Sequence, residues 1–483
     1  METERNKKTR LWGIAIFAIN AIVIVALAFL MLEINRGWKG VDFIVKNPSR
    51  AVFVVASVIL LLALTYGYLY FESKKILFNL LKLVEMFILL EVAMLFSFML
   101  GKYININARP CAFFAIMCAT LLGRRQAMFL NIIATLLIFI IDININLSEL
   151  ISAEMWTICA SMLMSFCSGT LVIFVSHMIK TRLQSLLLVI LLLVPIELII
   201  GIMEILFTSD VKADAIQLGY GALGAFFSTL LFIIVLPLFE LIFSEMTIFR
   251  LREITAPGAP LLKKLKTEAP GTFNHSVVVA QLAEACALDI GEDSELTRAC
   301  AYYHDVGKLK NPEMFTENQA DYNVHNELAP ELSTDIIRAH TRDGAKLIKK
   351  YHLPDFFADV AVQHHGTLPI KYFYAKALKM SDGEINIANY SYPGPVPQSR
   401  IAAIIMIVDA AEAATRSLTD RSTASIERLV GSIIEERVNL DQFVDCNITM
   451  RDLTVITHTI AQSLSGVYHN RISYPKLKIG KKN

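Results

Sequence analysis

The sequence predicts an all-α protein in two parts, a multi-pass transmembrane helical bundle followed by an all-helical soluble domain. The 483-residue chain is 55% hydrophobic, with a mean hydropathy of +0.51, which is too apolar for a purely soluble protein. The long apolar runs end near residue 245, and the composition changes sharply after Phe243. Beyond that point apolar residues recur at spacings of three and four, and no stretch alternates as strands do.

The amino-terminal part contains a first apolar run at about 11–32, which follows Lys7, Lys8 and Arg10. It exceeds a signal-peptide core in length and lacks a small-residue cleavage site, so we interpret it as an uncleaved anchor helix. Further runs lie at roughly 51–71, 79–100, 108–122, 127–143, 155–178, 184–207 and 217–245. The fourth and fifth runs of the chain are short for a hydrocarbon layer of about 30 Å and could form a re-entrant pair. We therefore predict an anchor helix with a short outer loop at 1–50 and a seven-helix bundle at 51–245.

Positive charges predict the orientation of this bundle. Cations gather in alternate loops on the side of the amino terminus, at Lys74, Lys75, Arg124, Arg125, Lys180 and Arg182. The opposite loops carry few cations, apart from the first, which holds Arg36, Lys39, Lys46 and Arg50. Because cytoplasmic loops are enriched in lysine and arginine, the balance predicts that both ends of the chain are cytoplasmic.

Four glutamates lie within the apolar runs, at Glu85, Glu91, Glu197 and Glu240. Each costs a few kcal/mol to insert, so a transporter or a proton relay could use them. Pairing inside the bundle, or placement near an interface, is the simpler interpretation. The runs show no convincing repeat of broken helices, which disfavours transport.

The carboxyl-terminal part begins with the loop 256–260, which contains two prolines and a glycine, and the basic stretch 263–266. We predict a linker at 246–262 and a soluble domain at 263–483, which is long enough to bury one core. Helical spacing predicts helices at 275–289, 294–305, 331–350, 355–365, 399–417, 424–437 and 450–468.

Seven histidine and aspartate residues of this domain are candidate metal ligands: His275, His304, Asp305, His340, His364, His365 and Asp409. His304 and Asp305 are adjacent, and an imidazole with a carboxylate suits Fe, Mn or Zn better than calcium, which prefers oxygen ligands. Asp409 lies in an apolar helix, where a lone carboxylate is costly to bury unless it is paired or bound to metal.

The order of these residues, H…HD…H…HH…D, resembles the HD-domain metal phosphohydrolases, whose two-metal members carry the extra histidines. More closely, the chain resembles the membrane-bound seven-transmembrane HD family, whose studied members are PgpH-type cyclic di-AMP phosphodiesterases. The segments that carry this resemblance cover most of 260–420 in the same order and include LLKKLKTEAPGTFNHSVVVAQLAEA, AYYHDVGKLKNPEMFTENQ, VQHHGT, KYFYAKAL, SYPGPVPQS and VDAAEAATRSL.

Two features depart from the relatives. Members of the family usually carry a large extracellular domain between the first two membrane helices, whereas only about 19 residues separate Leu32 from Ala51 here. Sensing through that domain is therefore expected to be absent, by nature or by deletion. The GYP signature of cyclic di-GMP-cleaving relatives is also missing after His365, which disfavours that substrate.

The resemblance implies a phosphodiesterase of the bacterial plasma membrane with a cytoplasmic HD domain. It implies hydrolysis of cyclic di-AMP to 5′-pApA by a hydroxide that two divalent transition-metal ions, Mn or Fe, activate. One ion would be held by His275, His304, Asp305 and Asp409, and the other by Asp305, His340, His364 and His365. Asp305 would thus bridge the ions and be essential for catalysis.

Four residues are candidates for binding the substrate. Lys308 follows His304 by one helical turn and could stabilise charge on a phosphate oxygen, and Arg416 lies two turns beyond Asp409. Tyr374 and Tyr392 could stack on adenine. The simpler interpretations are solvated cations for the first two, and core packing or a plain turn for the tyrosines.

Two alternatives remain from the sequence. The same site could act on another nucleotide, such as cyclic di-GMP or an alarmone, or the chain could be a membrane sensor or transporter whose HD domain only binds nucleotide. The lipid bilayer is an expected partner, and the helices at 424–437 and 450–468 could form a homodimer contact. No basic groove interleaved with aromatic residues suggests long nucleic acid.

Overall fold

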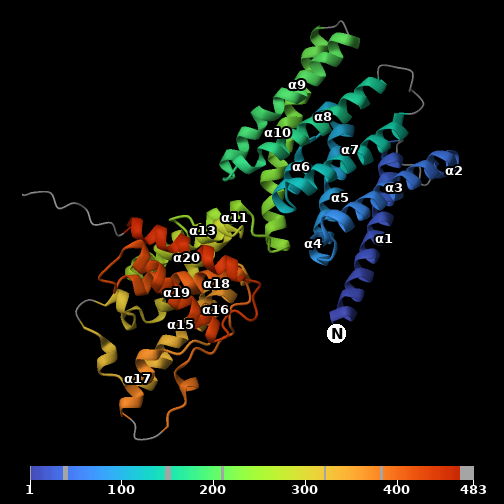
Figure 1. The fold of residues 1–483 in the computed structure, drawn as a ribbon. Coiled ribbons are helices and arrows are strands. Elements are labelled where there is room, and N and C mark those ends of the chain that lie inside the picture. Colours follow the sequence, from blue (N-terminus) through green and yellow to red (C-terminus); the bar gives the residue numbers. More distant parts are fainter. Residues whose placement is uncertain are drawn as a thin grey trace, which may run out of the picture. The chain divides into compact units, whose positions relative to one another are not determined.

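The computed structural model describes residues 2–35, 42–146, 154–207, 211–319, 322–380 and 384–467. These residues form helices joined by loops, and their β-pairing is confined to one isolated antiparallel bridge between Pro369 and Ser391 (Figure 1). The chain divides into two compact units, Met1–Phe249 and Arg250–Asn483. The predicted all-α fold, with a membrane bundle before a helical domain, is confirmed.

Among its described residues, the first unit contains seven helices that are long and apolar enough to cross a membrane. Their bounds are α1 (Glu2–Asn35), α3 (Pro48–Glu72), α5 (Leu80–Tyr103), α7 (Arg124–Asn146), α8 (Glu154–Val175), α9 (Leu187–Phe207) and α10 (Val211–Ile242). Shorter helices in this unit include α2 (Asp42–Lys46), α4 (Lys74–Leu77) and α6 (Phe113–Leu121). The run at 127–143, predicted to be short, lies in α7, which is long and apolar enough to cross a membrane by itself and therefore disfavours the re-entrant pair.

The short run at 108–122 forms α6, preceded by the 3₁₀ turn η1 (Ile106–Ala108). Arg109, just before α6, forms an ion pair with Asp142 near the carboxyl end of α7. At the other end of α6, the carbonyl of Leu121 accepts a hydrogen bond from Nζ of Lys82, in the first turn of α5. The segment therefore connects opposite ends of the bundle. Residues 113–118 are all buried, so this pass is enclosed by protein and need not match the lipid thickness.

The chain enters and leaves the bundle at the same end. A Cβ added to Gly13 of α1 would lie 3.4 Å from the carbonyl oxygen of Leu77, so the first part of α1 lies next to α4. After α10, Glu245 forms an ion pair of 2.6 Å with Lys82. At the opposite end, Nζ of Lys102 lies 2.5 Å from the carbonyl of Ile34, close to the end of α1. This geometry agrees with the even number of passes that the charges require, while the side of the membrane stays a prediction.

Two of the four glutamates within the apolar runs form ion pairs. Glu85 lies 3.2 Å from Lys82, and Glu240 lies 2.6 Å from Arg182. Glu91 and Glu197 each bury one carboxylate oxygen that has no hydrogen-bond partner in the described structure. Pairing inside the bundle therefore accounts for the first two glutamates and leaves the other two without an assigned role.

Ten α-helices lie in the described residues of the second unit, the first of which begins two residues before it. They are α11 (Ile248–Ile254), α12 (Pro260–Glu268), α13 (Pro270–Asp289), α14 (Ser294–Tyr303), α15 (Pro330–Lys350), α16 (Asp355–Gln363), α17 (Lys371–Met380), α18 (Arg400–Thr415), α19 (Thr423–Asn439) and α20 (Met450–Val467). Residues 401–408 of α18 are buried on every side, as expected for a helix that is apolar all round. Helix α13 packs against α14, α18 and α20, so α13 and α18 form the centre of this unit.

Most of the predicted linker at 246–262 is helical. The hydroxyl of Tyr303 donates to the carbonyl of Ile254 at 2.5 Å, and Arg252 forms an ion pair with Glu295 at 2.7 Å. Both contacts attach the end of α11 to α14. The part of the linker that follows Arg250 is therefore packed onto the soluble domain.

Candidate metal centre

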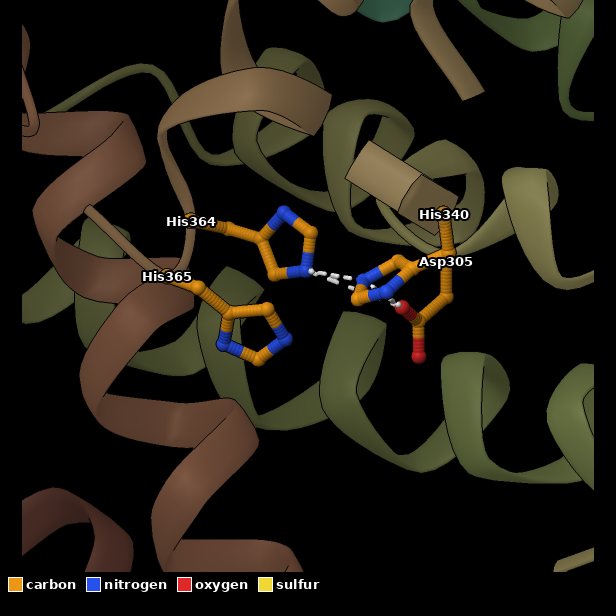
Figure 2. A group of neighbouring side chains, drawn as sticks. All are labelled: Asp305, His340, His364 and His365. Atoms are coloured by element: carbon orange, nitrogen blue, oxygen red, sulfur yellow. Dashed lines mark hydrogen bonds and ion pairs between the residues drawn. The ribbon is translucent and has the colours of Figure 1, made fainter. Parts of the chain in front are cut away.

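Asp305 lies at the centre of the predicted ligand set, in the turn between α14 and the 3₁₀ helix η5 (Val306–Lys310), and is almost fully buried. Its two carboxylate oxygens face different histidines. Oδ2 lies 3.7 Å from Nε2 of His275 and 3.4 Å from Nε2 of His304. Oδ1 lies 3.3 Å from Nε2 of His340 and 3.6 Å from Nε2 of His364 (Figure 2). A single carboxylate thus stands between two groups of nitrogen donors.

These donors form two groups that share Asp305. Within each group, one potential ligand atom per residue lies within 4.8 Å of all the others. The groups are His275, His304, Asp305 and Asp409, and Asp305, His340, His364 and His365. The structure therefore brings together all seven residues that the sequence predicted as ligands, in the two sets that the family resemblance implied. Their roles as ligands stay a proposal.

Five helices bring these side chains together. His275 comes from α13, His304 from the end of α14, His340 from the middle of α15, the pair 364–365 from the end of α16, and Asp409 from α18. A Cβ on Gly307 would overlap the carbonyl of His340, so glycine at this position allows η5 to approach α15 closely. That approach brings Asp305 next to His340.

Backbone carbonyls orient three of the imidazole rings. The Nδ1 atoms of His304, His340 and His364 lie 2.7, 2.6 and 2.9 Å from the carbonyl oxygens three residues earlier. Because a carbonyl can only accept, Nδ1 must carry the proton, and Nε2 of each ring is left as a lone-pair donor. The second nitrogen of a metal-bound histidine is held in this way in most metal sites. Nε2 of His304 and Oδ1 of Asp305 are buried and have no hydrogen-bond partner in the described structure, so the donor set fits a cation.

Glu412 orients the remaining ring of the first group. Its Oε2 lies 2.8 Å from Nδ1 of His275, whose Nε2 lies 2.9 Å from Oδ1 of Asp409. Burial alone lowers the pKa of His275, but its hydrogen bonds to Asp409 and Glu412 outweigh this effect and raise the pKa to about 10. Sequence reasoning missed Glu412. Its position in apolar α18, three residues after Asp409, was the available signal.

The second group has the opposite electrostatic character. Burial, together with the neighbouring histidines, lowers the pKa of His364 to about 4 and holds the pKa of His365 well below its usual value. Both rings are therefore neutral at pH 7, the protonation state in which imidazole binds metal. For Asp305, burial opposes ionisation, but the charge of Lys308 leads the interactions that hold its pKa well below the usual range.

Lys308 lies at the edge of the donor set. Its Nζ is 2.7 Å from Oδ2 of Asp305 and 2.8 Å from Oε1 of Glu317, and it lies 5.1 Å from the ring centre of Phe315. Burial disfavours the charged ammonium group, but Asp305 and Glu317 raise the pKa of Lys308 above its usual value. Lys308 is therefore a fixed cation beside the site. Glu317, which the sequence did not suggest, helps to position it.

A cavity of about 440 Å³ opens onto the site, and its lining includes His275, Lys308, His365, Tyr392, Asp409 and Arg416. The ring of Tyr392 stacks on His365, with centroids 4.3 Å apart and an interplanar angle of 28°. The side chain of Arg416 is about half exposed and binds Oε1 of Glu412 through Nε and Nη2, at 2.9 and 2.6 Å. Three of the four predicted substrate residues, Lys308, Tyr392 and Arg416, therefore line the cavity.

The prediction for Tyr374 is different. This ring lies 5.8 Å from that of Tyr390 and packs against a small separate core that contains Phe373 and Ala377. It does not line the cavity described above. Tyr374 is at helical spacing with apolar residues of α17, so packing accounts for its position, and its role in substrate binding stays a prediction.

Comparison with known proteins gives the class of this domain. The family model described as "HD domain" matches residues 272–414, the segment that contains all seven candidate ligands. Residues 272–414, which carry the candidate site, are therefore similar to HD domains.

Within that class, the chain is similar to the PgpH phosphodiesterases. It is 47% identical over 259 residues to "Cyclic-di-AMP phosphodiesterase PgpH" of Listeria monocytogenes. The aligned region covers 53% of this chain and 36% of that protein. It is 41% identical over 280 residues to the Bacillus subtilis protein of the same name, covering 57% of this chain and 39% of that protein. The matched region thus spans less than half the length of these relatives. A crystal structure of the L. monocytogenes PgpH HD domain in complex with cyclic di-AMP is 47% identical, with a TM-score of 0.43, and covers 44% of this chain and all of that one.

Proposed function

We propose that this protein is a membrane-bound, metal-dependent phosphodiesterase that hydrolyses cyclic di-AMP to 5′-pApA. The observation that supports this proposal most is the division of the Asp305 oxygens between two histidine groups, which suits one carboxylate bridging two cations. The substrate is suggested by the relatives at 41–47% identity, which carry the name cyclic-di-AMP phosphodiesterase.

In this proposal the seven ligands hold two divalent transition-metal ions, and Mn or Fe suits their mixed nitrogen and oxygen donors. When bound, such ions supply Lewis acidity toward a phosphate and a water nucleophile that is active at neutral pH. The residues of the chain would hold and orient these ions. His304, His340 and His364 are held by backbone carbonyls, so their donor atoms are oriented before any cation binds.

The cavity residues would position the dinucleotide. Lys308 is a buried cation beside Asp305 and would hold a non-bridging phosphate oxygen, where negative charge grows during hydrolysis. Arg416 lines the same cavity and would contact the second phosphate. Tyr392 presents an aromatic surface next to His365 and would stack on an adenine.

We further infer that the HD domain lies in the cytoplasm of a bacterium, at its plasma membrane. The end of the bundle where the chain enters and leaves also carries Lys74, Lys75, Arg125 and Arg182, and cations of this kind mark the cytoplasmic side.

A substrate panel tests the proposal. Purified protein in detergent, loaded with Mn, should convert cyclic di-AMP to 5′-pApA, with much less turnover of cyclic di-GMP or an alarmone, as chromatography of the products would measure. If the protein hydrolyses another nucleotide faster, the proposed metal site would stand but the proposed substrate would be wrong. If the protein binds cyclic di-AMP but forms no product with any metal tested, the sensor alternative would be favoured and the proposed enzymatic activity rejected.

A further inference from the structure

The membrane bundle contains a second polar cavity, at the end opposite to the one where the chain enters and leaves. Its volume is about 310 Å³, within the range of small-molecule sites and large enough for about ten water molecules at ~30 Å³ each. Five segments meet there, and each contributes a lining residue: Asn35 from α1, Lys102 from α5, Arg109 from the loop before α6, Asp142 from α7 and Ile158 from α8.

A buried ion pair lies in the wall of this cavity. Nη1 and Nη2 of Arg109 lie 2.5 and 2.8 Å from the two carboxylate oxygens of Asp142, and both side chains are only 7% exposed. The pair uses two of the five guanidinium N–H groups. Nε of Arg109 is buried and has no hydrogen-bond partner in the described structure. Burying such a pair is expensive in a membrane segment, and a polar group left unsatisfied there favours a functional role.

Close packing fixes the position of this guanidinium. A Cβ on Gly101 would overlap Nε of Arg109, so the glycine makes room for it. The turn η1 ends directly before Arg109 and is held by Asn107, whose side-chain amide donates to Oε1 of Gln217 in α10 at 2.9 Å. Arg109 is thus preorganised, and a ligand that used its remaining donors would not have to order it.

A second cation gives the cavity a net positive charge. Nζ of Lys102 donates to the carbonyl of Ile34 and forms no ion pair with a carboxylate among the described residues. Because Asp142 neutralises Arg109, the charge of Lys102 remains uncompensated in the lining. The rest of the wall is largely apolar, with Phe98, Ile106, Ile145 and Ile158.

From this arrangement we propose that the cavity binds a small organic carboxylate with a short apolar tail. The carboxylate would lie between Lys102 and Arg109, where charge-assisted hydrogen bonds are strongest. The tail would lie against Phe98 and the isoleucines. Asp142 would keep the guanidinium oriented.

Isothermal titration with butyrate tests this site in the full-length protein in detergent. Butyramide, which has the same shape without the charge, and butylammonium, which reverses the charge, are the matched probes. Butyrate should bind at least about tenfold more tightly than either, because both lose charge-assisted hydrogen bonds. Equal affinity for butyrate and butyramide, or no heat with butyrate up to about 10 mM, would overturn the proposal.

Two lysine substitutions show whether the binding is at this site. Lys102→Met keeps the aliphatic stem, removes the charge and should weaken butyrate binding about tenfold or more. Lys75→Met makes the same change in α4, at the other end of the bundle, and should leave the affinity unchanged. Equal affinities in the two variants, with unchanged elution and melting temperature, would place any binding elsewhere and reject the assignment.

Discussion

The carboxylate of Glu412 lies 2.8 Å from Nδ1 of His275, on the side of the ring that faces away from Asp305 and Asp409. Since the opposite nitrogen faces both aspartates, Glu412 fixes the direction of a proposed ligand without being one. Glu412 is in turn held by Arg416, so a chain of three side chains runs from the cavity mouth to the first metal position.

Removing the Glu412 carboxylate should weaken metal binding by the group that contains His275. We expect Glu412→Ala to lower the metal affinity of the site about 10–100-fold, as loss of such outer partners typically does. Glu412→Gln keeps an oxygen that can accept a hydrogen bond from Nδ1 of His275, so its metal affinity should fall much less. Competition with a fluorescent chelator measures the affinity. If the alanine and glutamine variants bind metal as well as the unmodified protein does, Glu412 has no role in orienting His275.

Asp305→Asn tests the bridge. The amide keeps the size of the side chain but removes the charge that both donor groups share, so the protein should lose both ions together rather than one. Elemental analysis and turnover would be measured on the same sample, with melting of the membrane unit as the folding control. A variant that keeps one ion and more than about a tenth of the turnover would show that Asp305 does not bridge.

Gly307→Ala tests the close approach of η5 to α15. A Cβ there overlaps the carbonyl of His340, so one element must move, at an expected cost of about 1–3 kcal/mol, and the distance from Asp305 to His340 should grow. Gly431→Ala in α19 is the matched control, because nothing lies within 4 Å of its added Cβ. The free energy of unfolding of this control variant should be unchanged or higher by up to about 1 kcal/mol. Chemical unfolding of both variants measures the difference, and equal stabilities would contradict the packing described here.

A soluble fragment tests whether catalysis needs the bundle. All proposed ligands lie between His275 and Asp409, and the second compact unit begins at Arg250. A fragment 250–483 should therefore fold, bind metal and hydrolyse cyclic di-AMP.

A shorter fragment, 261–483, should do the same but be less stable. It lacks Ile254, whose carbonyl binds the buried hydroxyl of Tyr303, and such a loss costs about 1–3 kcal/mol. Thermal melts compare the two fragments. If both are folded and metal-loaded but inactive, while the full chain in detergent is active, then the bundle completes the active site.

The sequence predicted seven helices of the second unit but not α12 or α17, and it predicted the seven residues that meet at the candidate metal centre. Helix limits such as 450–468, found as Met450–Val467, follow from apolar spacing, whereas the two proposed ligand sets were implied by the family resemblance. Tyr374 shows the limit of this reasoning, because an aromatic residue at helical spacing has the same pattern whether it packs or binds. Arg109 and Asp142 are 33 residues apart, and only the antiparallel course of α6 and α7 brings them together. Glu412 could not be separated from a surface glutamate until the ring of His275 was placed beside it.

The rate of cyclic di-AMP hydrolysis as a function of bound metal tests the central claim most directly. Protein stripped with a chelator would be titrated with Mn or Fe, with bound metal and 5′-pApA measured at each step. We predict no activity without metal and a rate that rises until two ions are bound per chain, because Asp305 completes two donor groups at once. A rate that is already maximal at one ion, or full activity in the stripped protein, would contradict the two-metal phosphodiesterase proposed here.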